Sequence, residues 1–277
     1  MNDIKDAMES AGLSPFKHID IPDNGKLIRY RVVGDKPGSQ NGWVVLHGGT
    51  YPAGAFGSWK NGESHTWQQA FTKPPSAAEQ AVIRKQRAQL NQAQAAEREA
   101  VYAAARVKAQ RLWSLARPAF DSHEYLSRKQ VRAYGFRQLR DMLLIPLRDT
   151  GGVLHSVQFI TPDGTKRFLT GGRTKGCYCS LGIPTDSVLI AEGIATACTL
   201  YEATGRATAA CFSCTNMLEV ARSLRAKFPR IKLIVCADND AGTPGNPGLA
   251  KAMEAAKAVN GYLAVPVLGR GAVSCLN

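Results

Sequence analysis

Two kinds of hydrophobic period alternate along residues 187–266 of the 277-residue chain. The apolar runs Val188 to Ala191 and Ile231 to Ala237 are typical of buried strands, and each ends at acidic residues. The positions between and after them predict a helix over Ile194–Thr204, a strand over Ala207–Cys211, helices over Met217–Phe228 and Leu249–Val259, and a strand over Tyr262–Val265. Strands and helices that alternate at this spacing predict an α/β domain, a parallel sheet with helices on both faces.

The pattern upstream is less regular. A short amphipathic helix, with Ile4, Met8 and Leu13 at helical spacing, is expected within the first sixteen residues. Short β-type runs then alternate with Gly, Pro, Asn and Asp, which predicts a small aromatic-rich β module with strands at Leu27–Val33, Trp43–His47 and Ala55–Trp59. Its aromatic side chains can form a core or stack on bases, and Arg29, Arg31 and Lys60 keep the second reading open.

A helix and a second β region fill the middle of the chain. The Ala-rich stretch from Pro74 to Arg117 has no interior Gly or Pro, which favours one long helical connector. Beyond it, runs of apolar residues separated by turn residues predict antiparallel strands at Leu143–Arg148, Val153–Ile160 and Lys166–Leu169. We therefore expect four parts, namely residues 1–73 (β module), 74–118 (helix), 119–186 (basic β subdomain) and 187–277 (α/β domain).

Acidic residues follow two strands of the predicted parallel sheet. Glu192 comes directly after the first strand, and Asp238 and Asp240 come after the strand that ends at Ala237. Ligands of such sheets bind beyond the carboxyl ends of the strands, so the three carboxylates are expected at one rim. Hard oxygen ligands without His or Cys favour Mg²⁺ or Mn²⁺, and such ions handle phosphates. Each motif alone can also be a helix cap or a polar turn.

The charge of the chain points to a polyanionic partner. Its formal net charge is +13 and its pI is near 9.6. Between Arg84 and Arg140 thirteen Lys or Arg stand against four Asp or Glu, which indicates nucleic acid, although a solvated helix face would look similar. Arg128, Lys129 and Arg132 lie on adjoining turns of a short predicted helix. Four basic residues flank or follow the predicted hairpin beside Gly171 and Gly172, where they can bind phosphates: Lys166, Arg167, Arg173 and Lys175.

Cysteines and apolar runs bear on cofactors and compartment. Seven cysteines, several inside predicted strands or helices, indicate reduced thiols, so a cytoplasmic location is expected. The spacings Cys177-x-Cys179 and Cys211-x-x-Cys214 fit a zinc site poorly, and no zinc is expected. No apolar run approaches the length of a membrane span and the first residues lack the core of a signal peptide, so no membrane partner is expected.

A Glu-Gly after one strand and Asp-x-Asp after another resemble the Toprim domain of bacterial-type primases, topoisomerases and some nucleases. The preceding run is similar to the basic half of a primase polymerase core: Ile145-Pro146-Leu147-Arg148-Asp149, Gly152, Gln158-Phe159, Lys166-Arg167-Phe168-Leu169, Lys175-Gly176 and Leu181-Gly182. The blocks GTKRFLTGG, EGIATA and DNDAGTPGNPG are more like the Toprim primases of plasmids, phages and integrated elements. This resemblance covers Asp121 to Pro266.

The resemblance implies a DNA primase, a nucleotidyltransferase that makes short RNA primers on single-stranded DNA from ribonucleoside triphosphates. Glu192, Asp238 and Asp240 would hold two metal ions, and Lys166 and Lys175 would contact nucleotide or template as part of the catalytic site. Further nucleic-acid contacts are expected from Arg128, Lys129, Arg132, Arg148, Arg167 and Arg173. The expected partners are a single-stranded template and a replicative helicase, which would be a separate chain because no GxxxxGK[ST] motif is present.

Two departures from the family pattern leave alternatives open. Thr196 stands where replicative primases commonly have Asp, and no acidic residue follows the last predicted strand. A metal-dependent Toprim nuclease is one alternative. A DNA-binding replication accessory with a catalytically weak site is the other. A topoisomerase is not favoured, since nothing marks any of the eight tyrosines as a nucleophile.

Overall fold

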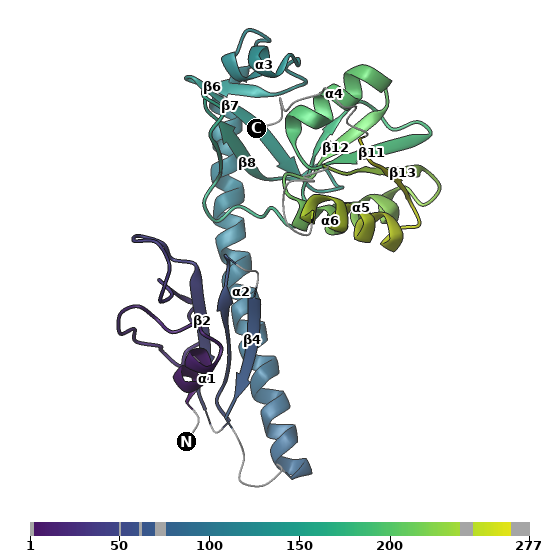
Figure 1. The fold of residues 1–277 in the computed structure, drawn as a ribbon. Helices are drawn as coiled ribbons and strands as arrows, with labels where there is room; N and C mark the ends of the chain where they lie inside the picture. Colours follow the sequence, from purple (N-terminus) through teal and green to yellow (C-terminus); the bar gives the residue numbers. More distant parts are fainter. Residues whose placement is uncertain (1–2, 50, 61–62, 70–75, 239–245, 267–277) are drawn as a thin grey trace. The chain divides into compact units, whose positions relative to one another are not determined.

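The computed structural model describes residues 3–49, 51–60, 63–69, 76–238 and 246–266 (Figure 1). The chain divides into two compact units, Met1–Ala93 and Gln94–Asn277, and the boundary falls inside the long helix α2 (Ala77–Leu115). Among the described residues, no helix is both long enough and apolar enough to span a membrane.

The first unit contains a four-stranded antiparallel meander and a short helix. Its elements are α1 (Ile4–Ser10), β1 (Ile28–Tyr30), β2 (Gly42–His47), β3 (Ala53–Ser58) and β4 (Glu63–Gln68), and the strand order follows the chain. Ile4 and Met8 of α1 are fully buried in its core with Val44 and Phe56, as the helical spacing predicted. The fourth strand escaped prediction because ESHTWQ has no apolar alternation and is mostly exposed, so its place comes from backbone pairing with β3.

Aromatic residues of this unit divide between core and surface. Phe56 is buried and its ring stacks on His65 at 5.2 Å between centroids, which makes it a core residue. Trp59 is 58% exposed, and the centroid of its ring lies 5.7 Å from the centroid of the Trp43 ring. Lys60 donates to the buried carboxylate of Asp35 at 2.9 Å.

Helix α2 is defined at both ends by local contacts. Ser76 and Glu79 form a capping box at its start, in which each side chain bonds to the other residue's amide. Near its end Ala109, Leu112 and Trp113 pack against the second unit's antiparallel sheet. The single helix expected over residues 74–117 is therefore confirmed, with bounds at Ala77 and Leu115.

The antiparallel sheet of the second unit contains five strands in chain order. They are β5 (Arg117–Pro118), β6 (Arg137–Leu139), β7 (Met142–Arg148), β8 (Leu154–Ile160) and β9 (Lys166–Phe168). The three main strands agree with the sequence prediction. One face carries Leu154, Val157 and Leu169 against α2, and the other carries Leu143, Ile145 and Ile160 against α3 (Glu124–Lys129) and α4 (Ile194–Thr204).

The α/β domain follows with a sheet ordered β10-β12-β11-β13-β14. Its strands are β10 (Cys179–Leu181), β11 (Ser187–Ala191), β12 (Ala207–Ala210), β13 (Lys232–Cys236) and β14 (Tyr262–Ala264). All pairs are parallel except β10 with β12. The parallel strands and the bounds of α4 agree with the sequence prediction. The antiparallel edge strand β10 was missed because its three residues carry no readable period.

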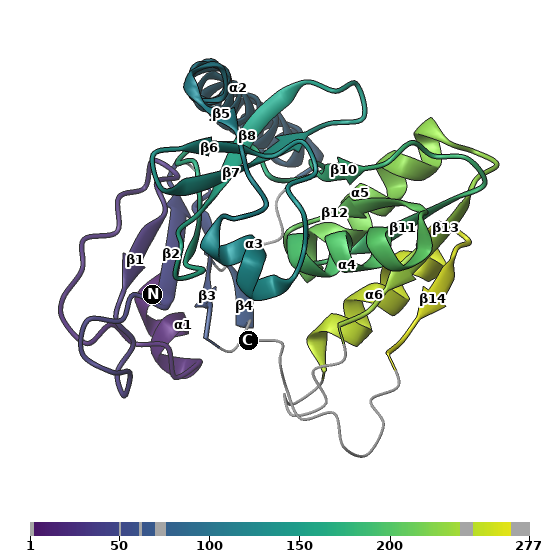
Figure 2. The same cartoon turned by 90° about the horizontal axis from the view of Figure 1, so that it is seen from above.

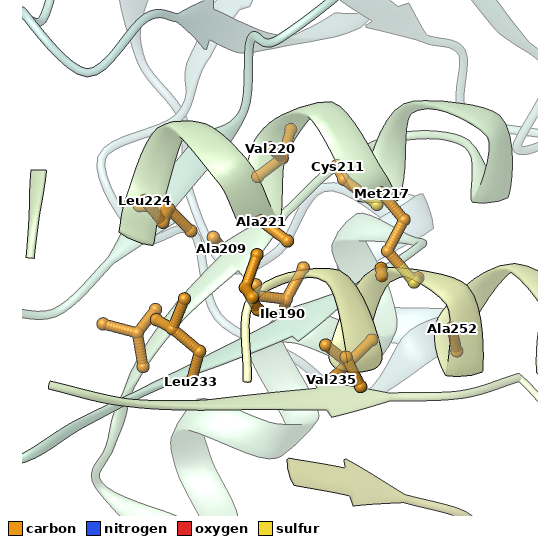
Figure 3. Close-up of a cluster of buried hydrophobic side chains, with 14 of the residues drawn as sticks. Ile190, Ala209, Cys211, Met217, Val220, Ala221, Leu224, Leu233, Val235 and Ala252 are labelled. Carbon is orange, nitrogen blue, oxygen red and sulfur yellow. The ribbon is translucent and has the colours of Figure 1, made fainter. Parts of the chain in front are cut away.

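Helices cover both faces of this sheet, as expected. On one face α5 (Cys214–Lys227) and α6 (Pro247–Ala258) bury Met217, Val220 and Ala252 against the strands (Figure 3). On the other face α4 packs with α3 and the antiparallel sheet, and Figure 2 shows α3 beside α4. The buried cluster between these elements therefore joins the two sheets of the second unit, and it fixes the antiparallel sheet relative to the ends of the parallel strands.

Candidate functional site at the carboxyl edge of the parallel sheet

The site begins where the strand order of the parallel sheet reverses. From β11 the chain passes through α4 to β12 on one side, and it then passes through α5 to β13 on the other side of β11. A crevice for ligands forms at such a switch point, outside the carboxyl ends of the two central strands. Glu192 follows β11 and Asp238 follows β13, and the paired register of Ile190 with Val235 brings these two chain ends to the same level.

The chain around Asp238 approaches helix α6 closely. A Cβ atom added to Gly248, in the first turn of α6, would lie 2.8 Å from the carbonyl oxygen of Asp238. Only glycine permits this approach without a shift of backbone. Asn246 caps the helix by accepting from the amide of Leu249. Asp240, the third predicted carboxylate, lies outside the described residues, so its position stays a prediction.

Lys166 of β9 shares this site with Glu192 and Asp238. The pKa of Lys166 is lowered from its ordinary value, because desolvation by the surrounding protein and repulsion from Lys129 outweigh the attraction of the two carboxylates. Both carboxylates therefore act on the Lys166 ammonium from within electrostatic range. Lys166 pairs in register with Ile160, on the sheet face that packs toward α3 and α4. The structure thus brings together a lysine and two acidic residues that are far apart in the sequence.

Helix α3 holds β9 in this place. The ammonium of Lys166 lies 5.7 Å from the centroid of the buried Tyr125 ring, a cation–π contact. Gly164, in the turn before β9, has a φ of +93°, and a Cβ there would meet an Arg128 guanidinium nitrogen at 2.8 Å. The backbone conformation therefore favours glycine at position 164, and the Arg128 side chain of α3 lies directly against this turn. Arg128 and Lys129 belong to the same neighbourhood as Lys166.

Other predicted basic residues have different surroundings. Arg167 pairs in register with Phe159, so it lies on the opposite face of the sheet from Lys166. Arg148 lies on that same opposite face, with its guanidinium 5.6 Å from the Trp113 ring of α2. Strand alternation therefore separates these two arginines from the carboxylate rim. The nucleic-acid contacts expected of Arg148 and Arg167 stay predictions, and both residues lie on the face of the sheet that packs toward α2.

Three more predicted residues take part in ion pairs or local contacts. Arg173 lies 3.4 Å from the Asp149 carboxylate, which also bonds to His155 at 2.7 Å. The Lys175 ammonium is 3.7 Å from Glu219 of α5. The backbone amide of Arg132 donates to Glu202 of α4, while its side chain is exposed.

Asn216, whose role the sequence pattern does not indicate, fixes the loop that carries Lys175. Its buried amide nitrogen lies 2.9–3.1 Å from the carbonyl oxygens of Thr174, Cys177 and Cys211, so its two N–H groups are shared among three acceptors. Its oxygen accepts from the amide of Gly176 at 2.8 Å. A single Asn just before the helix predicted over Met217–Phe228 gives no signal of this role in the sequence. The loop is thereby tied to the end of β12, beside the carboxylate rim.

The donors at this edge suit a hard cation better than a soft one. Glu192 and Asp238 offer carboxylate oxygens, which Mg²⁺ and Mn²⁺ prefer. Burial raises the pKa of Cys211 to about 12 and that of Cys236 to about 11, and the nearby carboxylates act in the same direction. These thiols are thus held protonated, which disfavours thiolate ligation. Among the described residues no three His, Cys, Asp or Glu side chains are grouped closely enough to hold a metal, and Asp240 lies outside that set.

The fold and the acidic edge together define a class of domain. Residues 187–271 match the family described as the Toprim domain. The chain therefore carries a Toprim domain, as its Glu-Gly and Asp-x-Asp motifs predicted.

The whole chain also has relatives among DNA primases. It is 33% identical to a DNA primase TraC of Escherichia coli over 98% of its length, and 33% identical to a second protein of that name and organism over 95%. The chain is thus homologous to these primases, and it spans 27% and 19% of their lengths. A crystal structure of the primase fragment of the bacteriophage T7 primase-helicase protein is also similar, at 14% identity and a TM-score of 0.40 over 55% of this chain and 66% of that one. That likeness is too weak to support an argument about function.

Proposed function

We propose that this chain is a primase-like nucleotidyltransferase that makes short RNA primers on a single-stranded DNA template. The observation that carries the proposal is the placement of Glu192 and Asp238 after adjacent parallel strands at the switch point of a Toprim domain, with Lys166 within electrostatic range of both. Homology to DNA primases along nearly the whole chain gives this site its context. The net charge of +13 suits a polyanionic template.

Glu192 and Asp238 would hold divalent cations, with Asp240 proposed as a third ligand. When bound, two Mg²⁺ or Mn²⁺ ions supply activation of the attacking 3′-hydroxyl and neutralise charge on the triphosphate. Lys166 would act as a point charge on phosphate oxygens, since its ammonium lies near the carboxylates whose metal ions would bind the triphosphate. The contact with Tyr125 would restrict where that ammonium can lie.

The test is an assay of the intact chain on single-stranded DNA with labelled ribonucleotides and Mg²⁺. We expect labelled oligomers from the native protein and none from Glu192→Gln, because the substitution removes the charge of a metal ligand and leaves the core intact. The matched control is Glu254→Gln, the same change on the exposed side of α6, where Glu254 pairs with Lys251 at 2.8 Å. Synthesis by Glu192→Gln at the native rate would refute the assignment of the site.

The same assay separates the alternatives. Shortened DNA with no labelled product would favour a Toprim nuclease, which uses the same metals for hydrolysis. Binding of DNA without either product would favour the accessory protein, for which Thr196 at the start of α4 was one indication.

A further inference from the structure

Two phenylalanines meet beside the carboxylate rim. Phe168 of β9 and Phe212, which follows β12, lie 6.0 Å apart between ring centroids with their planes at 84°. Phe168 is 40% exposed and belongs to none of the four buried clusters of the described residues. It sits on the edge strand of its sheet. Hydrophobic packing of the described core therefore gives no reason for a large aromatic ring at Phe168, whereas Phe212 is partly buried and packs against the cluster that includes Ile160 and Ile194.

The backbone of Phe212 is in an unusual conformation. Its φ is +67°, in the left-handed region that bulky residues rarely adopt. Neighbouring contacts hold it there, since its amide donates to the carbonyl oxygen of Glu192 at 2.7 Å and the Cys211 carbonyl accepts from Asn216 at 2.9 Å. Residues kept in such conformations concentrate at binding and active sites. The fold thus holds an aromatic ring next to Glu192 in a conformation that a glycine would adopt more easily.

The pair lies next to the charged groups already described. Phe168 is two residues from Lys166 on one strand, so both side chains project from the same face of the sheet. Phe212 is joined to Glu192 through its backbone. When the phosphates of a nucleotide are bound by Lys166 and by cations at the carboxylates, its base lies one sugar unit away from those phosphates. An exposed aromatic ring at that distance offers a stacking surface.

We propose that Phe168 and Phe212 form a platform on which one nucleobase stacks while its phosphates occupy the carboxylate site. The ligand is a purine or pyrimidine base, bound through its π-face and therefore with little preference for sequence. Phe168 supplies the exposed ring and Phe212 supports its edge. This inference rests on the proposed function, because it takes the phosphates at the rim to be those of a nucleotide or strand.

The probes are 2-aminopurine riboside triphosphate and a single-stranded DNA with one 2-aminopurine, because stacking quenches the fluorescence of this base. The full-length chain is titrated with each probe in Ca²⁺, as the native protein and as Phe168→Leu and Phe168→Tyr. Leucine keeps apolar volume without a π-face, whereas tyrosine keeps the ring. We expect Phe168→Leu to weaken binding of the quenched probe at least fivefold, in line with loss of one base–aromatic contact. Phe168→Tyr should stay within about twofold.

The two probes identify the source of the base. Quenching of the triphosphate alone assigns the platform to the incoming nucleotide, and quenching of the DNA alone assigns it to the strand. If neither probe is quenched, or if the Leu and Tyr variants bind equally well, the platform is refuted even when primers are made. If the native protein makes no primers but loses quenching on Phe168→Leu, the proposed function fails and the platform stands. Thermal unfolding of both variants verifies that they fold.

Discussion

Lys166 and Lys175 differ in their surroundings, although the sequence gives them the same expected role. The Lys166 ammonium is attracted by the carboxylates of Glu192 and Asp238, while the Lys175 ammonium forms an ion pair with Glu219. We predict that Lys166→Ala slows primer synthesis at least tenfold, about 1.4 kcal/mol of transition-state stabilisation. DNA affinity should change by no more than one surface contact. Filter binding beside the primer assay measures both quantities, and an equal loss in the two would place Lys166 on the template path.

Lys175→Ala is the companion variant. If Lys175 contacts the nucleotide, as the family resemblance implies, its removal should also slow synthesis about tenfold. An equal effect would place both lysines on the triphosphate, whereas native activity would leave Lys175 to its ion pair with Glu219. Steady-state measurement of the nucleotide KM and of kcat for both variants decides between these two outcomes.

Tyr125 contributes a ring and a buried hydroxyl to the surroundings of Lys166. Burial raises its pKa to about 12, so the hydroxyl is neutral at physiological pH. That hydroxyl has no hydrogen-bond partner among the residues the structure describes. The ring, 5.7 Å from the Lys166 ammonium, is therefore the part that bears on the site.

We predict that Tyr125→Phe keeps native nucleotide KM and unfolds at the native temperature or above, because an unsatisfied buried hydroxyl is removed. Tyr125→Leu should raise the KM severalfold, since the cation–π contact, worth about 0.5–2 kcal/mol, is lost. Steady-state kinetics and thermal unfolding test the pair. A rise in KM for Tyr125→Phe equal to that for Tyr125→Leu would assign the effect to the hydroxyl.

At the scale of elements, the start of α5 and the loop before β10 depend on each other. Asn216 bonds to three carbonyl oxygens and one amide, and all of these partners except Cys211 lie 39–42 residues earlier in the chain. We predict that Asn216→Ala lowers the free energy of unfolding by about 1–3 kcal/mol or more, because buried acceptors lose their donor. Hydrogen exchange should increase at residues 174–177.

A nearby serine provides the control for this change. Ser223 lies on the same helix, and its hydroxyl donates to the Glu219 carbonyl one turn earlier. Ser223→Ala should therefore leave the denaturant midpoint nearly unchanged. Equal midpoints for Asn216→Ala and Ser223→Ala would contradict the role given to Asn216.

At the scale of the whole molecule, excess positive charge should govern binding of DNA. Each neutralised phosphate of a single strand releases counterion, so the logarithm of affinity should fall against that of salt with a slope of about −0.7 per contact. We predict that joint replacement of Arg128, Lys129 and Arg132 by Gln flattens this slope. Joint replacement of Lys5, Lys17 and Lys36 by Gln removes the same amount of charge from exposed residues of the first unit. This control should change the salt slope less. An equal effect of the two sets would mean that general charge, and not a template path at α3, governs binding.

The sequence by itself determined most elements of the second unit and the nature of its acidic edge. Strong apolar periods end at Glu192 and Asp238, and the helix over Ile194–Thr204 has the bounds predicted for it. These features are local, since an apolar run, a cap and a turn act within a few residues. For this reason β11, α4 and β13 could be predicted without any partner segment.

Only the tertiary structure decided which residues meet at that edge. Strand alternation and register turn Lys166 toward the carboxylates and Arg167 toward α2, although the two are neighbours in the chain. The places of β4, β10, Asn216 and Phe212 depend on pairing or hydrogen bonding with distant segments. A sequence period can show that a face is buried, but the segment that buries it is chosen by long-range packing, because the same apolar pattern fits many partners.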